Sequence, residues 1–323
     1  MKVTVLAGGV GGAKFLRGLR TLAGLDITAV ANTGDDLWLT GLRVCPDLDS
    51  IMYALGGIND VQRGWGRADE TERVSAELTA YGVGWPWFTL GDLDLGTHIA
   101  RSSMLREGST LTEATARLAA RWNLGVTLLP ATDDEVETHV EILDPDSGEV
   151  TLIHFEEWWV KHRARIEARR FVQIGVERSR ASDVVLRAIG EADVVLLAPS
   201  NPVVSIGTIL GLPGIVDALR ASSAPVVGVS PIIGGAVVRG MANACLRSIG
   251  VETTADAVAM HYGARTTGPE GFLDGWLVDT ADAGALPLLE AAGIRARAIP
   301  LWMTDDAATA QIAAAALGIA AKL

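Results

Sequence analysis

The opening of the chain places the tightest limit on its fold. A short apolar run from Val3 to Ala7 is typical of a buried parallel strand. Glycines then crowd into the next few positions, at Gly8, Gly9, Gly11 and Gly12. Apolar side chains recur after them at helical spacing, at Phe15, Leu16 and Leu19. The segment therefore predicts a strand, a glycine turn and a helix, the unit with which many α/β proteins begin.

This glycine turn is suited to binding an anion. Glycine lets the backbone approach a ligand closely, and the free N–H groups at the start of a helix point toward it. The usual fingerprints do not match: a dinucleotide loop from Gly9 needs glycine at Lys14, and a Walker loop needs Gly-Lys-Ser/Thr at Ala13 to Phe15. We expect the four glycines and Lys14 to bind a phosphate. The alternative is a plain tight turn beside a solvated lysine.

A second predicted strand, Ile27 to Ala31, ends in a polar loop from Asn32 to Asp36. The carboxyl ends of parallel strands form the ligand crevice of such sheets, so this loop should lie beside the glycine turn. An NAD enzyme would carry a lone acidic residue at this strand end, whereas Asn32 occupies it here and two aspartates follow. A simple turn rich in Asn, Gly and Asp is the alternative.

Two further aspartates, Asp47 and Asp49, precede an apolar helical pattern that starts at Ile51. Asp49 or Ser50 would serve as its N-cap. Mg²⁺ prefers one or two carboxylates together with water and substrate phosphates. We therefore expect a magnesium site with Asp35 and Asp49 as ligands and Asp36 and Asp47 as alternates.

The remaining pattern indicates a mostly parallel, Rossmann-like α/β sheet in a single domain spanning residues 1–323. Further apolar strands are expected over 126–129, 193–198, 225–229, 272–278 and 296–301. A hairpin is expected around the turn at 144–148, and a mixed surface helix at 156–163. We expect the segment at roughly 60–180 to be a helical and hairpin insertion that covers the ligand crevice.

Composition excludes several classes of protein. The net charge of −12 argues against broad binding to nucleic acid or to anionic membranes. Cys45 and Cys245, the only cysteines, are far apart and in no metal-binding spacing. No apolar run is long enough to span a membrane, and the first one ends in glycines too early for a signal peptide. We expect a cytoplasmic protein.

Several blocks together resemble a known family. These are GGVGGAK, NTGDD, CPDLDS, LGDLDLGTHI, APSNPVVSIGTIL and SPIIGG, spread over nearly the whole chain. They are similar to the transferases that build the deazaflavin coenzyme F420, called 2-phospho-L-lactate transferase in archaea and phosphoenolpyruvyl transferase in actinobacteria (CofD/FbiA). Where relatives usually read GDRDLATH, this chain has Leu93 for the arginine and Gly96 for the alanine, which puts the role of that arginine in doubt here.

The resemblance implies a reaction. A phosphoenolpyruvyl or 2-phospholactyl group would move from a guanosine diphosphate-linked three-carbon acid to the deazaflavin Fo, with Mg²⁺ as cofactor. The products would be dehydro-F420-0 or F420-0, together with GMP. The sequence leaves the three-carbon group open among enolpyruvyl, lactyl and glyceryl, although resemblance to actinobacterial members favours enolpyruvate. A homodimer is expected from relatives and from the frequency of two-fold assembly.

The same resemblance assigns residues. Asp49 and Asp35 would contribute to catalysis by binding the metal ion. The Fo site would use Asp49, Thr89, Asp92 and Asp94, and the nucleotide site would add Ser200, Asn201 and Ser205 to the glycine turn. His98 would be packed and hydrogen bonded rather than act as a base. The competing class is a nucleotide-sugar-binding metabolic regulator, to which a related bacterial family belongs.

Overall fold

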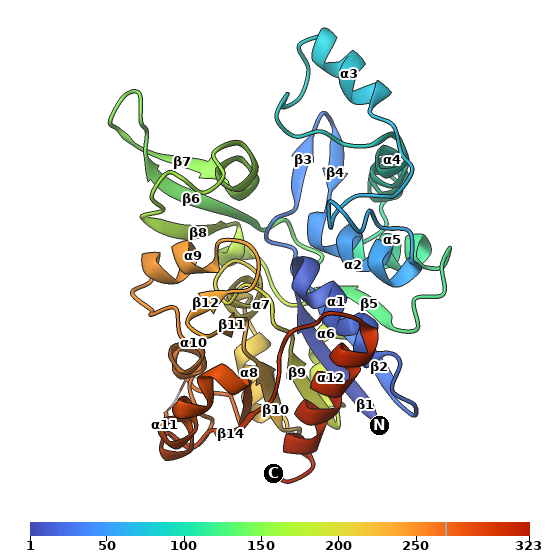
Figure 1. The fold of residues 1–323 in the computed structure, drawn as a ribbon. Coiled ribbons are helices and arrows are strands. Elements are labelled where there is room, and N and C mark those ends of the chain that lie inside the picture. The colour runs from blue at the N-terminus through green and yellow to red at the C-terminus, as the bar shows by residue number, and fades with distance from the viewer. Residues whose placement is uncertain (269) are drawn as a thin grey trace.

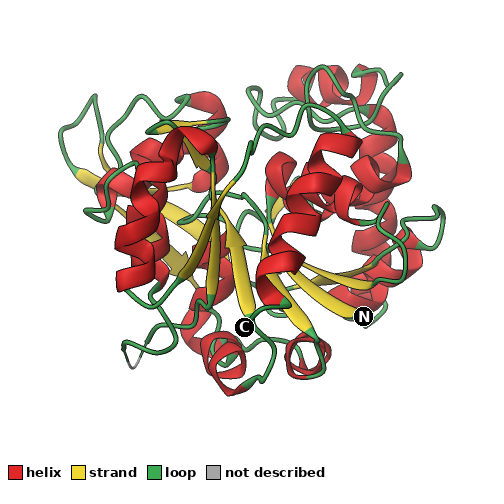
Figure 2. Ribbon diagram, turned by 60° about the horizontal axis from the view of Figure 1, so that its bottom comes forward, coloured by secondary structure: helices red, strands yellow, loops and turns green. Residues whose placement is uncertain are grey.

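The computed structural model describes residues 1–268 and 270–323, and its centre is a seven-stranded sheet in which every pairing is parallel. The strand order is β14-β13-β10-β9-β1-β2-β5 (Figures 1 and 2). The strands are β1 (Lys2–Ala7), β2 (Asp26–Ala31), β5 (Thr127–Pro130), β9 (Val194–Leu197), β10 (Val226–Val229), β13 (Gly275–Val278) and β14 (Arg295–Ala298). The predicted parallel α/β sheet is thus confirmed.

Helices cover both faces of this sheet, which explains why its central strands are continuous apolar runs. One core cluster packs the first face against α1 (Gly9–Leu19), α2 (Pro46–Gly56), α5 (Leu111–Ala119) and α12 (Asp306–Ala320). A second cluster packs the other face against α6 (Asp183–Gly190), α7 (Ile206–Gly211), α8 (Ile215–Ala221), α9 (Ala242–Ser248), α10 (Ala255–Tyr262) and α11 (Leu286–Ala291).

Smaller elements stand at the carboxyl end of the sheet (Figure 1). They include the hairpin β3 (Leu37–Leu39) and β4 (Leu42–Val44), the helices α3 (Arg73–Ala80) and α4 (Asp92–Arg106), and the two-stranded ribbon β11 (Ile232–Ile233) and β12 (Ala236–Val237). A separate antiparallel sheet contains β6 (Glu137–Leu143), β7 (Val150–His154) and β8 (Arg170–Ile174). Short 3₁₀ helices lie at Val176–Arg178 and Thr280–Ala285.

Two expectations for the middle of the chain are refined. Strand β5 falls inside the segment expected as an insertion, but it pairs with β2 in the main sheet and divides that segment in two. The expected surface helix is instead one π-helical turn, Glu157–Lys161, and its Trp158 is fully buried against Phe155 and Phe171. The hairpin around residues 144–148 is confirmed. None of the helices among the described residues is long and apolar enough to cross a membrane.

A glycine in β10 gives a direct test of the packing between strands. A Cβ at Gly228 would lie 2.1 Å from Cζ3 of the buried Trp276, its partner on β13. Gly228→Ala should therefore lower the free energy of unfolding by about 1–3 kcal/mol in urea titrations. The control is Gly190→Ala, since no atom lies within 4 Å of a Cβ at that exposed helical site. An equal loss in both variants would contradict the packing argument.

Candidate functional site

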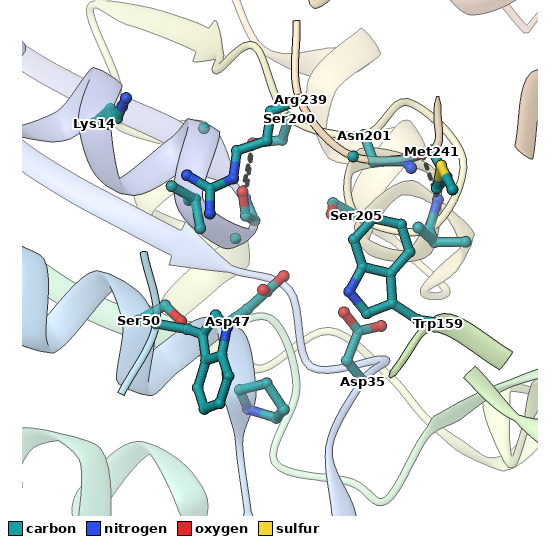
Figure 3. Close-up of a pocket in the computed structure, with 18 of the residues that line it drawn as sticks. Lys14, Asp35, Asp47, Ser50, Trp159, Ser200, Asn201, Ser205, Arg239 and Met241 are labelled. Atoms are coloured by element: carbon teal, nitrogen blue, oxygen red, sulfur yellow. Dashed lines mark hydrogen bonds between the residues drawn. The ribbon is translucent and has the colours of Figure 1, made fainter. Parts of the chain in front are cut away.

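A cavity of about 910 Å³ lies at the carboxyl end of the sheet. Its base consists of the glycine turn, the loops after β2 and β4, and the loop after β9 (Figure 3). Its upper wall comes from the segments around residues 63–72, 87–98 and 155–160, and from the segments 230–242 and 301–304. The cavity therefore lies where the strand order of the sheet predicts ligand binding.

The glycine turn is shaped by its contact with the loop after β9. Ser200 Oγ accepts a hydrogen bond from the N–H of Gly8 (3.0 Å) and lies 2.8 Å from the Gly8 carbonyl, to which it donates. A Cβ on Gly8 would lie 2.5 Å from Cβ of Ser205, and one on Gly11 would lie 2.5 Å from the carbonyl oxygen of Pro199. Only glycine fits these two positions, so the turn and the loop form one surface.

The individual residues of the expected nucleotide site differ in their surroundings. Gly8, Gly9, Gly11, Lys14, Ser200, Asn201 and Ser205 all line the cavity. Gly12 instead packs against Ala7 and Ser200. The Asn201 side-chain oxygen accepts hydrogen bonds from the N–H groups of Val203 (2.9 Å) and Val204 (3.2 Å), so this side chain fixes the loop.

One group of acidic side chains at the cavity base forms no ion pair with any of the described residues. Asp35, Asp47 and Glu156 all line the cavity and are nearly buried. Burial and the charges of Asp47 and Glu156 raise the pKa of Asp35 well above its usual value. Burial raises the pKa of Asp47 to about 6, while a hydrogen bond from Asn32 opposes the rise. Burial and Asp47 raise the pKa of Glu156 to about 8.

A second buried group is internally balanced. Arg101 donates a hydrogen bond to Asp49 Oδ1, and His98 Nδ1 lies 3.5 Å from Asp49 Oδ2. The other ring nitrogen of His98 lies 3.4 Å from Asp94 Oδ1, to which Tyr53 Oη also donates a hydrogen bond (2.6 Å). Burial opposes ionisation of Asp94, but His98 and Tyr53 together lower its pKa. Burial raises the pKa of Asp49, against Arg101 and His98.

The carboxylates and the imidazole of this second group also lie close enough together to be considered for a metal. The two carboxylates already accept hydrogen bonds from Arg101 and Tyr53, however, which leaves them less available to an ion. Arg101 Nη1 also lies 3.2 Å from His98 Nδ1, and because a guanidinium only donates, this ring nitrogen accepts the hydrogen bond. His98 is therefore packed and hydrogen bonded within the network, as expected.

The other expected site residues fall into two groups, those that line the cavity and those that face away from it. Thr89 lines the cavity, as do Asp94 and Asp49. Asp92, at the start of α4, is not among the lining residues and accepts hydrogen bonds from Thr71 Oγ1 and the Val74 N–H. Asp36 also faces away from the cavity, toward Arg43 at 3.7 Å, and burial raises its pKa to about 7.

The two departures from the family pattern lie outside the cavity. Leu93 is 42% exposed, and a Cβ at Gly96 would meet no atom within 4 Å. Neither position is among the residues that line the cavity. The local fold therefore accommodates both changes without strain at the site.

Sequence patterns missed part of the cavity wall. Trp87 and Phe88 line one side, and Trp87 stacks on Trp85 with centroids 4.7 Å apart. Phe155 and Trp159 line the cavity from the antiparallel sheet and its π-helical turn, with centroids 6.1 Å apart. The paired tryptophans at 158–159 were the available signal, but only the fold shows that one points inward and the other lines the cavity.

A parallel sheet with a glycine turn and acidic loops at its strand ends defines a Rossmann-like α/β protein suited to a phosphorylated ligand. A model of the family described as 2-phospho-L-lactate transferase CofD matches residues 3–294. The chain belongs to the CofD family.

Curated relatives match along the full length. A protein named phosphoenolpyruvate transferase from Streptomyces griseus is 56% identical over 324 residues, which cover 100% of this chain and 99% of the relative. A protein of the same name from Mycobacterium avium is 52% identical over 340 residues, covering 99% of each chain. Among solved structures, a UPF0052-family protein from Bacillus halodurans matches with a TM-score of 0.64 and 18% identity, covering 98% of each chain. This last likeness supports the fold alone.

The uncompensated acidic group predicts an unusual dependence of stability on pH. Because the folded pKa of Glu156 is raised from 4.5 to about 8, the folded state holds a proton that the unfolded state has lost across that window. In EDTA, the free energy of unfolding should therefore fall as pH rises from about 5 to 8. Glu156→Gln should flatten this fall, measured by urea unfolding at several pH values. The exposed Glu107→Gln serves as the control, and an unchanged slope in Glu156→Gln would refute the assignment.

Proposed function

We propose that this protein transfers a phosphoenolpyruvyl group from a guanosine diphosphate-linked donor to the deazaflavin Fo, releasing GMP. The observation that carries the proposal is the single cavity that combines a glycine turn, buried carboxylates and aromatic walls. It occurs in a chain that matches relatives named phosphoenolpyruvate transferase from end to end. Those relatives favour enolpyruvate over lactate as the three-carbon group, and dehydro-F420-0 as the product.

The donor would bind at the base of the cavity. The free N–H groups at the start of α1 and the ammonium of Lys14 would face its diphosphate, and Ser205 and the loop at Ser200 and Asn201 would hold the nucleotide side. Asp47 lies at the same helix start, where a Cβ on Gly9 would be 3.4 Å from its Oδ1. A diphosphate bound at this helix start would lie beside the Asp47 carboxylate, and a cation between them would offset their repulsion.

The residues present fit a magnesium ion. Asp35 Oδ1 is buried and has no hydrogen-bond partner among the described residues, and Asp47 and Glu156 add like charge beside it. Asp35 and Asp47 would hold the ion, whereas the charge of Asp49 is already matched by Arg101. When bound, Mg²⁺ would neutralise charge on the diphosphate.

The acceptor would enter between the aromatic walls. A planar deazaflavin ring can pack against indole and phenyl faces, which Trp87, Phe88, Phe155 and Trp159 offer. Asp49 would then receive the proton of the attacking ribityl hydroxyl, whose oxygen forms a bond to the phosphorus that carries the three-carbon acid. The bond from that phosphorus to the GMP oxygen breaks. Catalysis rests mainly on in-line positioning, as for other phosphoryl transfers.

Direct turnover tests this proposal. Purified protein with Fo, Mg²⁺ and enolpyruvyl-diphosphoguanosine should yield GMP and dehydro-F420-0 in equal amounts, measured by liquid chromatography with mass spectrometry. Asp49→Asn should reduce turnover by a factor of about 10² or more, because it removes the proton acceptor. A protein that binds a UDP-sugar and neither binds nor converts Fo would instead be a regulator of the competing class.

The metal assignment gives a separate prediction. Asp35→Asn should weaken Mg²⁺ binding at least about tenfold in calorimetric titrations, because it removes an unpartnered charged ligand. Asp36→Asn is a matched control from the same loop, since Asp36 faces Arg43 rather than the cavity. Equal losses in the two variants would contradict the distinction between these neighbours, and unaltered binding in Asp35→Asn would remove Asp35 from the site.

A further inference from the structure

Three lysine or arginine side chains line the cavity, and they differ in the partners that their charge has within the protein. These are Lys14, Arg63 and Arg239. Arg63 contacts three carboxylates, at 2.8 Å from Asp60, 3.4 Å from Glu70 and 3.6 Å from Glu72. Its charge is therefore satisfied within the protein.

Arg239 is different. Its only hydrogen bond among the described residues runs from Nη2 to the backbone carbonyl of Arg63, at 2.9 Å. No carboxylate in the described part of the chain lies within ion-pair distance of it. A guanidinium has five N–H donors, so most of its hydrogen-bonding capacity is available to a ligand.

The position of Arg239 places this charge at the mouth of the cavity. The residue follows β12, in a loop that returns to α9, and a Cβ at Gly64 would lie 2.4 Å from its Nη2. A Cβ on the adjacent Gly240 would lie 3.1 Å from Cη2 of Trp159. The loop therefore contacts two other parts of the cavity wall, and Arg239 is held against one of them by its hydrogen bond to Arg63.

The proposed donor needs such a group. It carries a negative charge on each phosphate and another on the carboxylate of its three-carbon acid, whereas the cavity is lined by several acidic side chains. The glycine turn, Lys14 and a metal at Asp35 and Asp47 account for only part of that charge. Guanidinium groups bind carboxylate and phosphate oxygens through paired hydrogen bonds.

We propose that Arg239 binds an oxyanion of the donor beyond its first phosphate, either the second phosphate or the carboxylate of the three-carbon acid. This inference rests on the proposed function and deepens it by adding a residue that recognises the end of the donor distal to guanosine. Both oxyanions present the same chemistry to a guanidinium, and the ligands used in the test separate them.

The test compares GMP, GDP and enolpyruvyl-diphosphoguanosine by calorimetry with Mg²⁺, in wild type, Arg239→Met and Arg239→Lys. Arg239→Met should weaken the complete donor at least about tenfold while GMP changes less than about twofold. A parallel loss for GDP identifies the second phosphate, and a loss confined to the complete donor identifies the carboxylate. The affinity of Arg239→Lys for the donor should lie between those of the wild type and Arg239→Met, because lysine keeps the charge and loses the planar fork.

The control is Arg247→Met, which removes the same charge from an exposed position on α9 that does not line the cavity. It should leave all three affinities unchanged. The inference is overturned if Arg239→Met weakens GMP as much as the donor, if it changes nothing, or if Arg247→Met gives the same loss. The turnover of the wild-type protein is measured separately, because it tests the proposed function itself. If Arg239→Met selectively loses GDP binding but the wild type releases no GMP from the donor and Fo, the transferase proposal is wrong and the assignment of Arg239 as an anion-binding residue is kept.

Discussion

The close approach of the glycine turn to the loop after β9 is the contact on which the cavity depends. Ser200 Oγ bonds to both the N–H and the carbonyl of Gly8, and side chains at Gly8 or Gly11 would collide with Ser205 or Pro199. These two loops leave neighbouring strands β1 and β9, so the parallel sheet fixes their separation. The glycines therefore do more than admit a ligand: they allow two strand-end loops to form one continuous floor.

Above that floor, charge is distributed unequally. The network of Asp49, Asp94, His98 and Arg101 pairs each carboxylate with a cationic or hydrogen-bonding partner, which buried charges require. The described residues place no cationic side chain beside Asp35, Asp47 and Glu156, where Asp47 accepts a hydrogen bond from Asn32, and burial raises all three pKa values. The first group contains its own cationic partner, Arg101, whereas a cation from solution would offset the charge of the second. This difference supports separate roles in holding the acceptor and in holding a metal-bound donor.

The sequence predicted those cavity residues that lie at the carboxyl ends of the parallel strands. The glycine turn, Asp35, Asp47 and the loop at Ser200 converge because parallel strands deliver them to one edge. It was less informative for residues that line the cavity or not according to the direction of their side chains. Asp92 and Asp94 differ only in their place on the first turn of α4, yet one caps a neighbouring segment and the other faces the cavity. Glu156 and Trp159 depend on how the antiparallel sheet packs, and no local pattern encodes that placement.

The acidic character of the cavity has a consequence for how an anionic donor is admitted. With a net charge of −12 and carboxylates at the cavity base, a free diphosphate meets repulsion both at long range and at the site. A magnesium complex of the same donor carries less negative charge and supplies the cation that Asp35 and Asp47 lack. On the proposed function, the protein would bind the metal complex in preference to the free nucleotide. Lys14 and Arg239, which form no ion pair among the described residues, would then bind oxygens that the metal leaves uncovered. The proposed function therefore implies that metal-free nucleotide would bind weakly, because of the acidic charge at the cavity base.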